Sequence, residues 1–268
     1  MAKVQFTSAL GSEYENLFNA CVIKPEKMTV VEGIITKLMA NRARYEMLAN
    51  ELGIPWYVIA VIHNMEASIN FNCHLHNGDS LTRRTIHVPA GRPQNGQPPF
   101  SWEESAADAL TSRGLGSDTD WSLAGCLYQI EGYNGWGYRL YHAHVLSPYL
   151  WSFSSHYISG KYVADGTWSD AAKSGQCGAG VLLRRMAEHH QVDFPDQPAP
   201  NSSVQPLIPT YRTTKSQDPL VTARAEAMQS WLNTFPGIFV KADGIPGMRT
   251  SEAYQLVTGH YLPGDPRG

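Results

Sequence analysis

IPWYVIAVIHNME, residues 54–66, is a strongly apolar stretch that ends on a single acidic residue, Glu66. Pro55 suits the first turn of a helix, because the proline nitrogen needs no hydrogen-bond acceptor there. The residues that follow are apolar nearly all round, which is typical of a helix buried on every side. We therefore expect a central buried helix with a carboxylic acid at its C-terminal end.

Helical patterns surround this stretch on both sides. Residues 29–53 form an amphipathic pattern that predicts one helix ending at Gly53, whereas residues 70–99 are rich in glycine and proline and predict no helix. We expect a loop and a small β-hairpin there, because residues 82–89 (TRRTIHVP) alternate like a strand. Further helices are expected within residues 101–110, 121–135, 175–190, 220–233 and 243–259.

The composition indicates two modules. Five prolines fall within residues 192–209, where helical periodicity is lost, so we expect a linker at 196–207. It would separate a mainly helical module, residues 1–195, from a small helical module, residues 208–268.

Bulk composition excludes several classes of function. The chain has 268 residues, 43% hydrophobic and 17% charged, with a net charge of -3, so no nucleic-acid partner is expected. No stretch approaches the roughly 20 apolar residues that span a bilayer, and residues 1–16 lack the apolar core of a secretory signal. We expect synthesis in the cytoplasm without a signal peptide. The four cysteines are widely separated and are expected to be reduced thiols.

Glu66 is placed where its pKa should rise. An apolar environment and the negative end of a helix dipole both disfavour the charged carboxylate. A carboxylic acid that stays protonated near neutral pH can protonate the leaving oxygen of a glycosidic bond. Asp79, on the following loop, could then act as base or charge stabiliser, and Thr85 could help to hold a water. Glu66 could equally be a solvated helix-end residue, and Asp79 a turn residue.

The same residues resemble the lysozyme-like superfamily. Glu66-Ala67-Ser68 is similar to the Glu-Ser that marks the catalytic acid of goose-type lysozymes and lytic transglycosylases. Asp79 and Thr85, separated by five residues, resemble the aspartate and threonine of phage-type lysozymes. The Glu66-to-Asp79 gap is longer than in that family, so Glu103, Glu104, Asp120 or Glu131 could supply the second group instead.

A second segment carries the same resemblance. Residues 132–136, Gly-Tyr-Asn-Gly-Trp, resemble the Ala-Tyr-Asn-Ala-Gly segment of those enzymes, in which the Tyr and Asn contact the sugar. Tyr133 and Asn134 are therefore implied to bind substrate. We add His63, Asn77 and Tyr138 as further substrate-binding candidates, and Tyr149 could line the groove or pack in the core.

The C-terminal module resembles the helical peptidoglycan-binding domain of wall hydrolases. That family carries a Leu-Gln-x-x-Leu-Asn helix and then an Asp-Gly-x-x-Gly-x-x-Thr turn. Residues 228–233 (MQSWLN) and 243–250 (DGIPGMRT) fit both motifs. Asp243, Gly244, Gly247 and Thr250 are implied to belong to the wall-binding module, and we expect Thr250 to cap the last helix.

Together these resemblances imply a mainly α protein: a lysozyme-like α+β catalytic domain with a small β-hairpin, followed by a helical peptidoglycan-binding domain. The implied activity is that of an endolysin, an N-acetylmuramidase that uses no cofactor or metal, acts as a monomer and reaches the periplasmic wall by a holin or another export route. Three enzymes stay open as alternatives, namely a lytic transglycosylase, a chitinase-type glycosidase and a zinc amidase or peptidase. A non-catalytic wall-binding protein is the fourth. The zinc reading rests on the potential ligands between His63 and Asp79.

Overall fold

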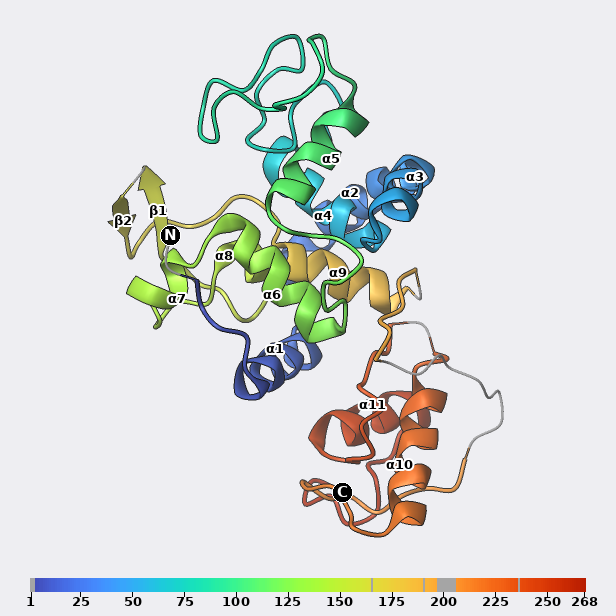
Figure 1. The fold of residues 1–268 in the computed structure, drawn as a ribbon. Helices are drawn as coiled ribbons and strands as arrows, with labels where there is room; N and C mark the ends of the chain where they lie inside the picture. The colour runs from blue at the N-terminus through green and yellow to red at the C-terminus, as the bar shows by residue number, and fades with distance from the viewer. Residues whose placement is uncertain (1–2, 165, 190, 197–205, 236) are drawn as a thin grey trace. The chain divides into compact units, whose positions relative to one another are not determined.

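The computed structural model describes all residues except 1–2, 165, 190, 197–205 and 236 (Figure 1). Contacts divide the chain into two compact units, Met1–Tyr14 with Cys21–Leu183, and Glu15–Ala20 with Arg184–Gly268. Helix α1 (Ser8–Ala20) and helix α9 (Ala179–Glu188) each contribute to both units. Most of the expected linker, 196–207, lies outside the described residues, so that boundary stays a prediction.

The first unit is mainly helical. Its remaining elements are η1 (Pro25–Lys27), α2 (Met28–Ala40), α3 (Arg42–Leu52), α4 (Trp56–Ala67), α5 (Trp102–Ser112), α6 (Leu123–Asn134), α7 (Gly137–Tyr141), α8 (Pro148–Trp151), β1 (Lys161–Ala164) and β2 (Thr167–Ser169). The two strands pair antiparallel, with Tyr162 opposite Trp168. Over the residues that the structure describes, a mainly α chain with one small sheet is therefore confirmed. The prediction of a single helix over residues 29–53 was wrong in detail, because the helix is interrupted at Asn41, which separates α2 from α3.

Helix α4 is the centre of this unit, as its sequence predicts. Every residue from Tyr57 to Met65 is buried, and the helix contacts α3 and α6. The helix ends where Ser68 and Ile69 adopt positive φ values of 51° and 62°. The Ser68 backbone N–H donates to the Asn64 carbonyl, which closes the last turn in the manner of a left-handed C-cap. Glu66 is thereby fixed in the final turn.

The segment after α4 is a loop without the expected hairpin. In residues 70–99 the only β-type pairing is an isolated bridge between Cys73 and Ser80. Side chains take the backbone donors that a strand would need: Asp79 accepts from Ile86 and His87, and Thr85 accepts from Arg92. The prolines of this segment have no N–H to offer a ladder. The prediction of a hairpin here was wrong, and the sheet lies at residues 161–169.

The second unit contains α10 (Pro219–Leu232) and α11 (Met248–Thr258). Both expected helices are confirmed, and they pack around a core that includes Met228, Leu232 and Tyr254. Within the described part of the chain, no helix is long and apolar enough to cross a membrane.

Candidate active site around Glu66

Glu66 lies half-buried at the C-terminal end of α4. The Gln176 side-chain amide donates to the Met65 carbonyl at 2.7 Å, which anchors the last turn. Burial raises the pKa of Glu66 to about 7, although the hydrogen bond from Tyr149 and the positive charge of Arg113 both lower it. Glu66 can therefore be either protonated or ionised near neutral pH, as a group that exchanges protons during catalysis must be.

Two tyrosines and an arginine surround this carboxyl group. The Tyr149 hydroxyl, on α8, donates to Glu66 Oε1 at 2.7 Å. Tyr133, on α6, is buried and donates its hydroxyl to the Leu75 carbonyl at 3.0 Å. The Arg113 guanidinium, at the end of α5, lies 5.0 Å from the centre of the Tyr133 ring. Burial, and then the nearby Glu66 charge, raises the pKa of both tyrosines, so both stay neutral donors.

The sequence predicted only part of this group of residues. Glu66 and Tyr133 were expected in the site, and the structure brings them within electrostatic range of each other. Tyr149 was expected only as a possible groove-lining residue, and Arg113 was not expected at all. Tyr149 lies 83 positions from Glu66, and no local pattern shows that the two side chains meet.

Asp79 is a fully bonded anion on the loop beside α4. The loop approaches closely at Gly78, where a Cβ atom would lie 3.0 Å from the Glu66 carbonyl oxygen. Asp79 Oδ2 accepts from the backbone N–H groups of Ile86 and His87, and Oδ1 pairs with His87 Nδ1 at 2.6 Å. Burial raises the pKa of Asp79, but these bonds from His87 and Ile86 outweigh that effect and lower it to about 2. Asp79 is thus a permanent negative charge and a weak base.

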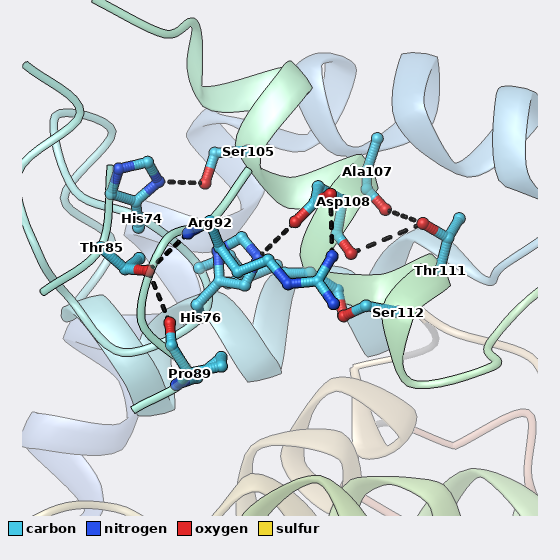
Figure 2. Close-up of polar contacts among 12 residues, drawn as sticks. His74, His76, Thr85, Pro89, Arg92, Ser105, Ala107, Asp108, Thr111 and Ser112 are labelled. Carbon is cyan, nitrogen blue, oxygen red and sulfur yellow. Dashed lines mark hydrogen bonds and ion pairs between the residues drawn. The ribbon is translucent and has the colours of Figure 1, made fainter. Parts of the chain in front are cut away.

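Thr85 makes its hydrogen bonds within the loop that contains it. Its hydroxyl donates to the Pro89 carbonyl at 2.5 Å and accepts from the Arg92 backbone N–H at 2.9 Å, as Figure 2 shows. The side chain is buried, so its only O–H is already used inside the protein. Thr85 therefore shapes the loop that carries Asp79, and in this arrangement it has no donor left for a water.

A polar cluster ties the same loop to α5 (Figure 2). His76 Nε2 bonds to one oxygen of Asp108 at 2.8 Å, and the Arg92 guanidinium lies 3.4 Å from the other. His74 bonds to the Ser105 hydroxyl at 2.7 Å through Nδ1. Burial lowers the pKa of His76, although the hydrogen bond that His76 donates to Asp108 raises it. These side chains fix the loop.

The remaining candidates for substrate binding are scattered. His63 is fully buried and bonds to the Tyr45 hydroxyl, and burial lowers its pKa to about 4. Asn77 bonds to the His87 carbonyl and to the Asp79 N–H, within the loop. Tyr138 is buried against the rings of Tyr162 and Trp168. Asn134 is exposed at the end of α6. Of these, only Asn134 presents its side chain freely to solvent.

A cavity of about 370 Å³ adjoins this group and shares Arg113 and Tyr133 with it. Its other lining residues are Lys3, Leu115, Tyr128, Gln129, Gly132, Gly135 and Trp136. Gly132, Tyr133, Gly135 and Trp136 therefore line this cavity, Asn134 does not, and Tyr133 belongs both to the cavity and to the group around Glu66.

The motif of residues 228–250, which was expected to bind the wall, is held together by one buried side chain, Gln229. Its amide N–H group lies 2.9 Å from Asp243 Oδ1 and 3.1 Å from both the Ile245 carbonyl and Thr250 Oγ1, and its carbonyl accepts from the Gly244 N–H. Gly244 has φ 76°, which favours glycine. The expectation that Thr250 caps α11 was wrong: Gly247 is the N-cap, and Thr250 points inward to Gln229.

In the part of the chain that the structure describes, no three His, Cys, Asp or Glu side chains are grouped so that they could hold a metal ion. The histidines of the loop bond to Ser105, Asp108 and Asp79 instead. No protein-family model matches the chain, and neither a curated protein nor a solved structure matches it.

Proposed function

We propose that the first unit is a glycosidase that cleaves the β-1,4 bonds of peptidoglycan, with Glu66 as general acid. The observation that carries this proposal is the Glu66 carboxyl, which burial holds at a pKa of about 7 while Tyr149 orients one of its oxygens. A donor with a pKa near the working pH is efficient at protonating a leaving oxygen. The cavity that shares Arg113 and Tyr133 with this group is partly aromatic, and aromatic side chains suit contact with a pyranose.

The bonding of Asp79 favours one of its two expected roles. Its oxygens already accept three hydrogen bonds, and its pKa of about 2 makes it a poor proton acceptor. A fixed negative charge can still stabilise the oxocarbenium-like transition state of glycoside cleavage. We therefore assign Asp79 to charge stabilisation in an N-acetylmuramidase.

The low basicity of Asp79 also favours a lytic transglycosylase as a second candidate. In that reaction the 6-hydroxyl of the muramoyl residue attacks its own anomeric carbon, and no water has to be activated by a second carboxylate. A single acid that later accepts a proton, Glu66, would then be sufficient.

The second unit is proposed to bind the wall. Its turn, residues 243–250, supports this role by its resemblance to the wall-binding motif, and tethering would raise the concentration of the catalytic cleft at an insoluble polymer. We propose bacterial peptidoglycan as the partner and no cofactor. We also propose release to the wall in the manner of an endolysin.

Product analysis tests the proposed function. Fragments released from purified peptidoglycan by the wild type and by Glu66→Gln are compared by mass spectrometry. Products ending in reducing muramic acid identify a muramidase, and anhydro-muramic products identify a lytic transglycosylase. Cleaved peptide bonds, or products unaffected by Glu66→Gln, would refute the proposal.

Asp79→Asn should lower the yield of reducing-end products about ten- to hundredfold, because it removes the carboxylate charge proposed to stabilise the positively charged transition state. The matched control is His87→Ala, which frees Asp79 Oδ1 and keeps the carboxylate charge. We expect this control to retain most activity in the same assay. Full activity of Asp79→Asn would show that the residue only shapes the loop.

Tyr149→Phe should reduce the rate about ten- to hundredfold through lost orientation of the acid. It should also move the alkaline limb of the pH–rate profile to higher pH. The sign follows because the Tyr149 hydrogen bond lowers the pKa of Glu66, and its removal lets that pKa rise. The general acid then stays protonated to higher pH. A rate loss without any movement of the limb would assign Tyr149 a purely structural role.

A further inference from the structure

A second cavity, of about 350 Å³, lies at the end of α4 and takes no part in the candidate active site. Its walls come from α2, from the C-terminal end of α4 and from residues 175–177. Asn64 lines it and Glu66 does not. Two positions along a helix correspond to a rotation of roughly 200°, so these two side chains leave α4 on opposite faces. The cavity is therefore separate from the site at which a glycan would meet Glu66.

The side chain of Asn64 is the buried polar group of this cavity. It is 6% exposed, and among the described residues its only contact is a long one, from the amide N–H group to Met65 Sδ at 3.9 Å. Its side-chain carbonyl has no hydrogen-bond partner in that part of the chain. Buried amides normally use both donor and acceptor, because unpaired polar groups cost free energy. Asn64 therefore favours a ligand that offers an acceptor and a donor together.

One face of α2 forms another wall of the cavity. Val30, Ile34 and Lys37 follow the helical spacing that places side chains along a single face. Val30 is 49% exposed, and Lys37 is exposed without an acidic partner among the described residues. No acidic residue lines the cavity. This wall thus offers an apolar surface with a free positive charge at one end.

The turns that border the cavity are strained. Ser68, Ile69 and Phe153 have φ values of 51°, 62° and 77°, and they are the non-glycine residues with positive φ in the described part of the chain. All three line this cavity. Positive φ is least favourable for a β-branched residue such as Ile69, and strain of this kind is concentrated at functional and ligand sites. The strained turns follow α4 and α8, the helices that carry Glu66 and Tyr149. A ligand bound here therefore contacts the backbone that positions both.

We propose that this cavity is a second ligand site, which binds the end of a short peptide with a free carboxylate. A peptide amide group pairs with both polar atoms of Asn64, a small apolar side chain packs on Val30 and Ile34, and the carboxylate meets Lys37. A neutral sugar would leave Lys37 unused, and a simple anion would leave Asn64 unpaired. Only the source of the peptide rests on the proposed function: the peptide stems of the wall end in D-alanine, which has this chemistry.

Titration of the full-length wild type with N-acetyl-lysyl-D-alanyl-D-alanine, followed by NMR, tests this inference without any cleavage step. We expect the side-chain NH₂ signal of Asn64, identified by its loss in Asn64→Leu, to move as the peptide binds. Replacing the terminal carboxylate of the peptide by an amide should weaken binding about three- to tenfold.

Two variants separate the two polar contacts. Lys37→Gln, at an exposed position, should weaken binding of the peptide acid about three- to tenfold and leave the peptide amide unchanged. Asn64→Leu should weaken both peptides about tenfold without lowering the urea concentration of unfolding, because it removes an amide that has no partner. Lys3→Gln removes an equal charge from an exposed position in the same unit that does not line this cavity, and it should change neither affinity.

The remaining outcomes distinguish this site from the proposed function. An Asn64 signal that does not move, or binding that depends on neither Lys37 nor the carboxylate, would overturn the peptide site. Movement of the same signal by N-acetylglucosamine tetramer but not by the peptide would also overturn it. Tighter binding of the all-L peptide would overturn the wall as the source. If the D-peptide binds as expected but the wild type releases no glycan products from peptidoglycan, only the proposed glycosidase function fails.

Discussion

Replacing Glu66 by glutamine should lower the rate of glycan cleavage by about 10²–10⁴-fold. Glutamine keeps the shape of the side chain and can still accept the Tyr149 hydrogen bond, but it cannot deliver a proton. The measurement is the initial rate of release of soluble fragments from purified peptidoglycan at pH 5–8.

The same substitution should increase stability at alkaline pH. The pKa of Glu66 is raised to about 7 in the folded chain, from an ordinary value of 4.5. The folded state therefore binds the proton more tightly, and stability falls as pH rises through the window from 4.5 to 7. The cost above pH 7 is at most about 3 kcal/mol, because each pKa unit corresponds to roughly 1.4 kcal/mol and the side chain is partly exposed.

Glutamine has no charged form, so this cost disappears. We expect the variant to unfold at a higher urea concentration than the wild type at pH 8 and at a similar one at pH 4. Glu51→Gln, an exposed substitution on α3, serves as the control and should show no such pH-dependent difference. A Glu66→Gln chain that is less stable than the wild type at pH 8 would mean that the carboxylate is a structural group.

The apolar run before Glu66 made both its helix and its unusual pKa predictable. Nine consecutive buried residues leave the acid little water, and burial is the largest cause of the shift. The sequence was sufficient to predict the raised pKa because the helix that carries Glu66 itself supplies the apolar environment. The catalytic role of Glu66 stays a prediction.

The loop that carries Asp79 and Thr85 was harder to predict. Its alternating pattern favoured a strand, but Asp79 and Thr85 use their side chains to bind the backbone N–H groups of residues 86, 87 and 92. Which side chain reaches which donor depends on the folded loop. Arg113 was missed, and the bond from Tyr149 to Glu66 was not predicted, for a related reason, since both residues meet Glu66 only through tertiary packing.

The second unit shows that a motif can be placed correctly and explained wrongly. The spacing of Asp243, Gly244 and Thr250 predicted a tight turn before a helix, and the turn is present. The reason for the Gln and Thr of the motif is the bond between them, which links α10 to the start of α11. Helix-capping rules depend only on residues near the helix end, so they could not predict that Thr250 binds Gln229, 21 positions away.

Gln229→Ala should therefore destabilise the second unit by about 3–5 kcal/mol. The side chain is 1% exposed and contacts Asp243, Gly244, Ile245 and Thr250 through hydrogen bonds. Alanine would leave several of these groups buried without their partner, and each such group costs roughly 1–3 kcal/mol unless water reaches it. The measurement is chemical denaturation of the full chain.

Wall binding should be lost together with this unit, while cleavage of short soluble glycan fragments should continue. Gln255→Ala, on α11, removes the same type of side chain from a partly exposed position and should cost less than about 1 kcal/mol. If Gln229→Ala left both stability and sedimentation with peptidoglycan unchanged, the glutamine network would not be what holds the turn. If stability fell but sedimentation with the wall persisted, the wall contact would have to lie in the first unit.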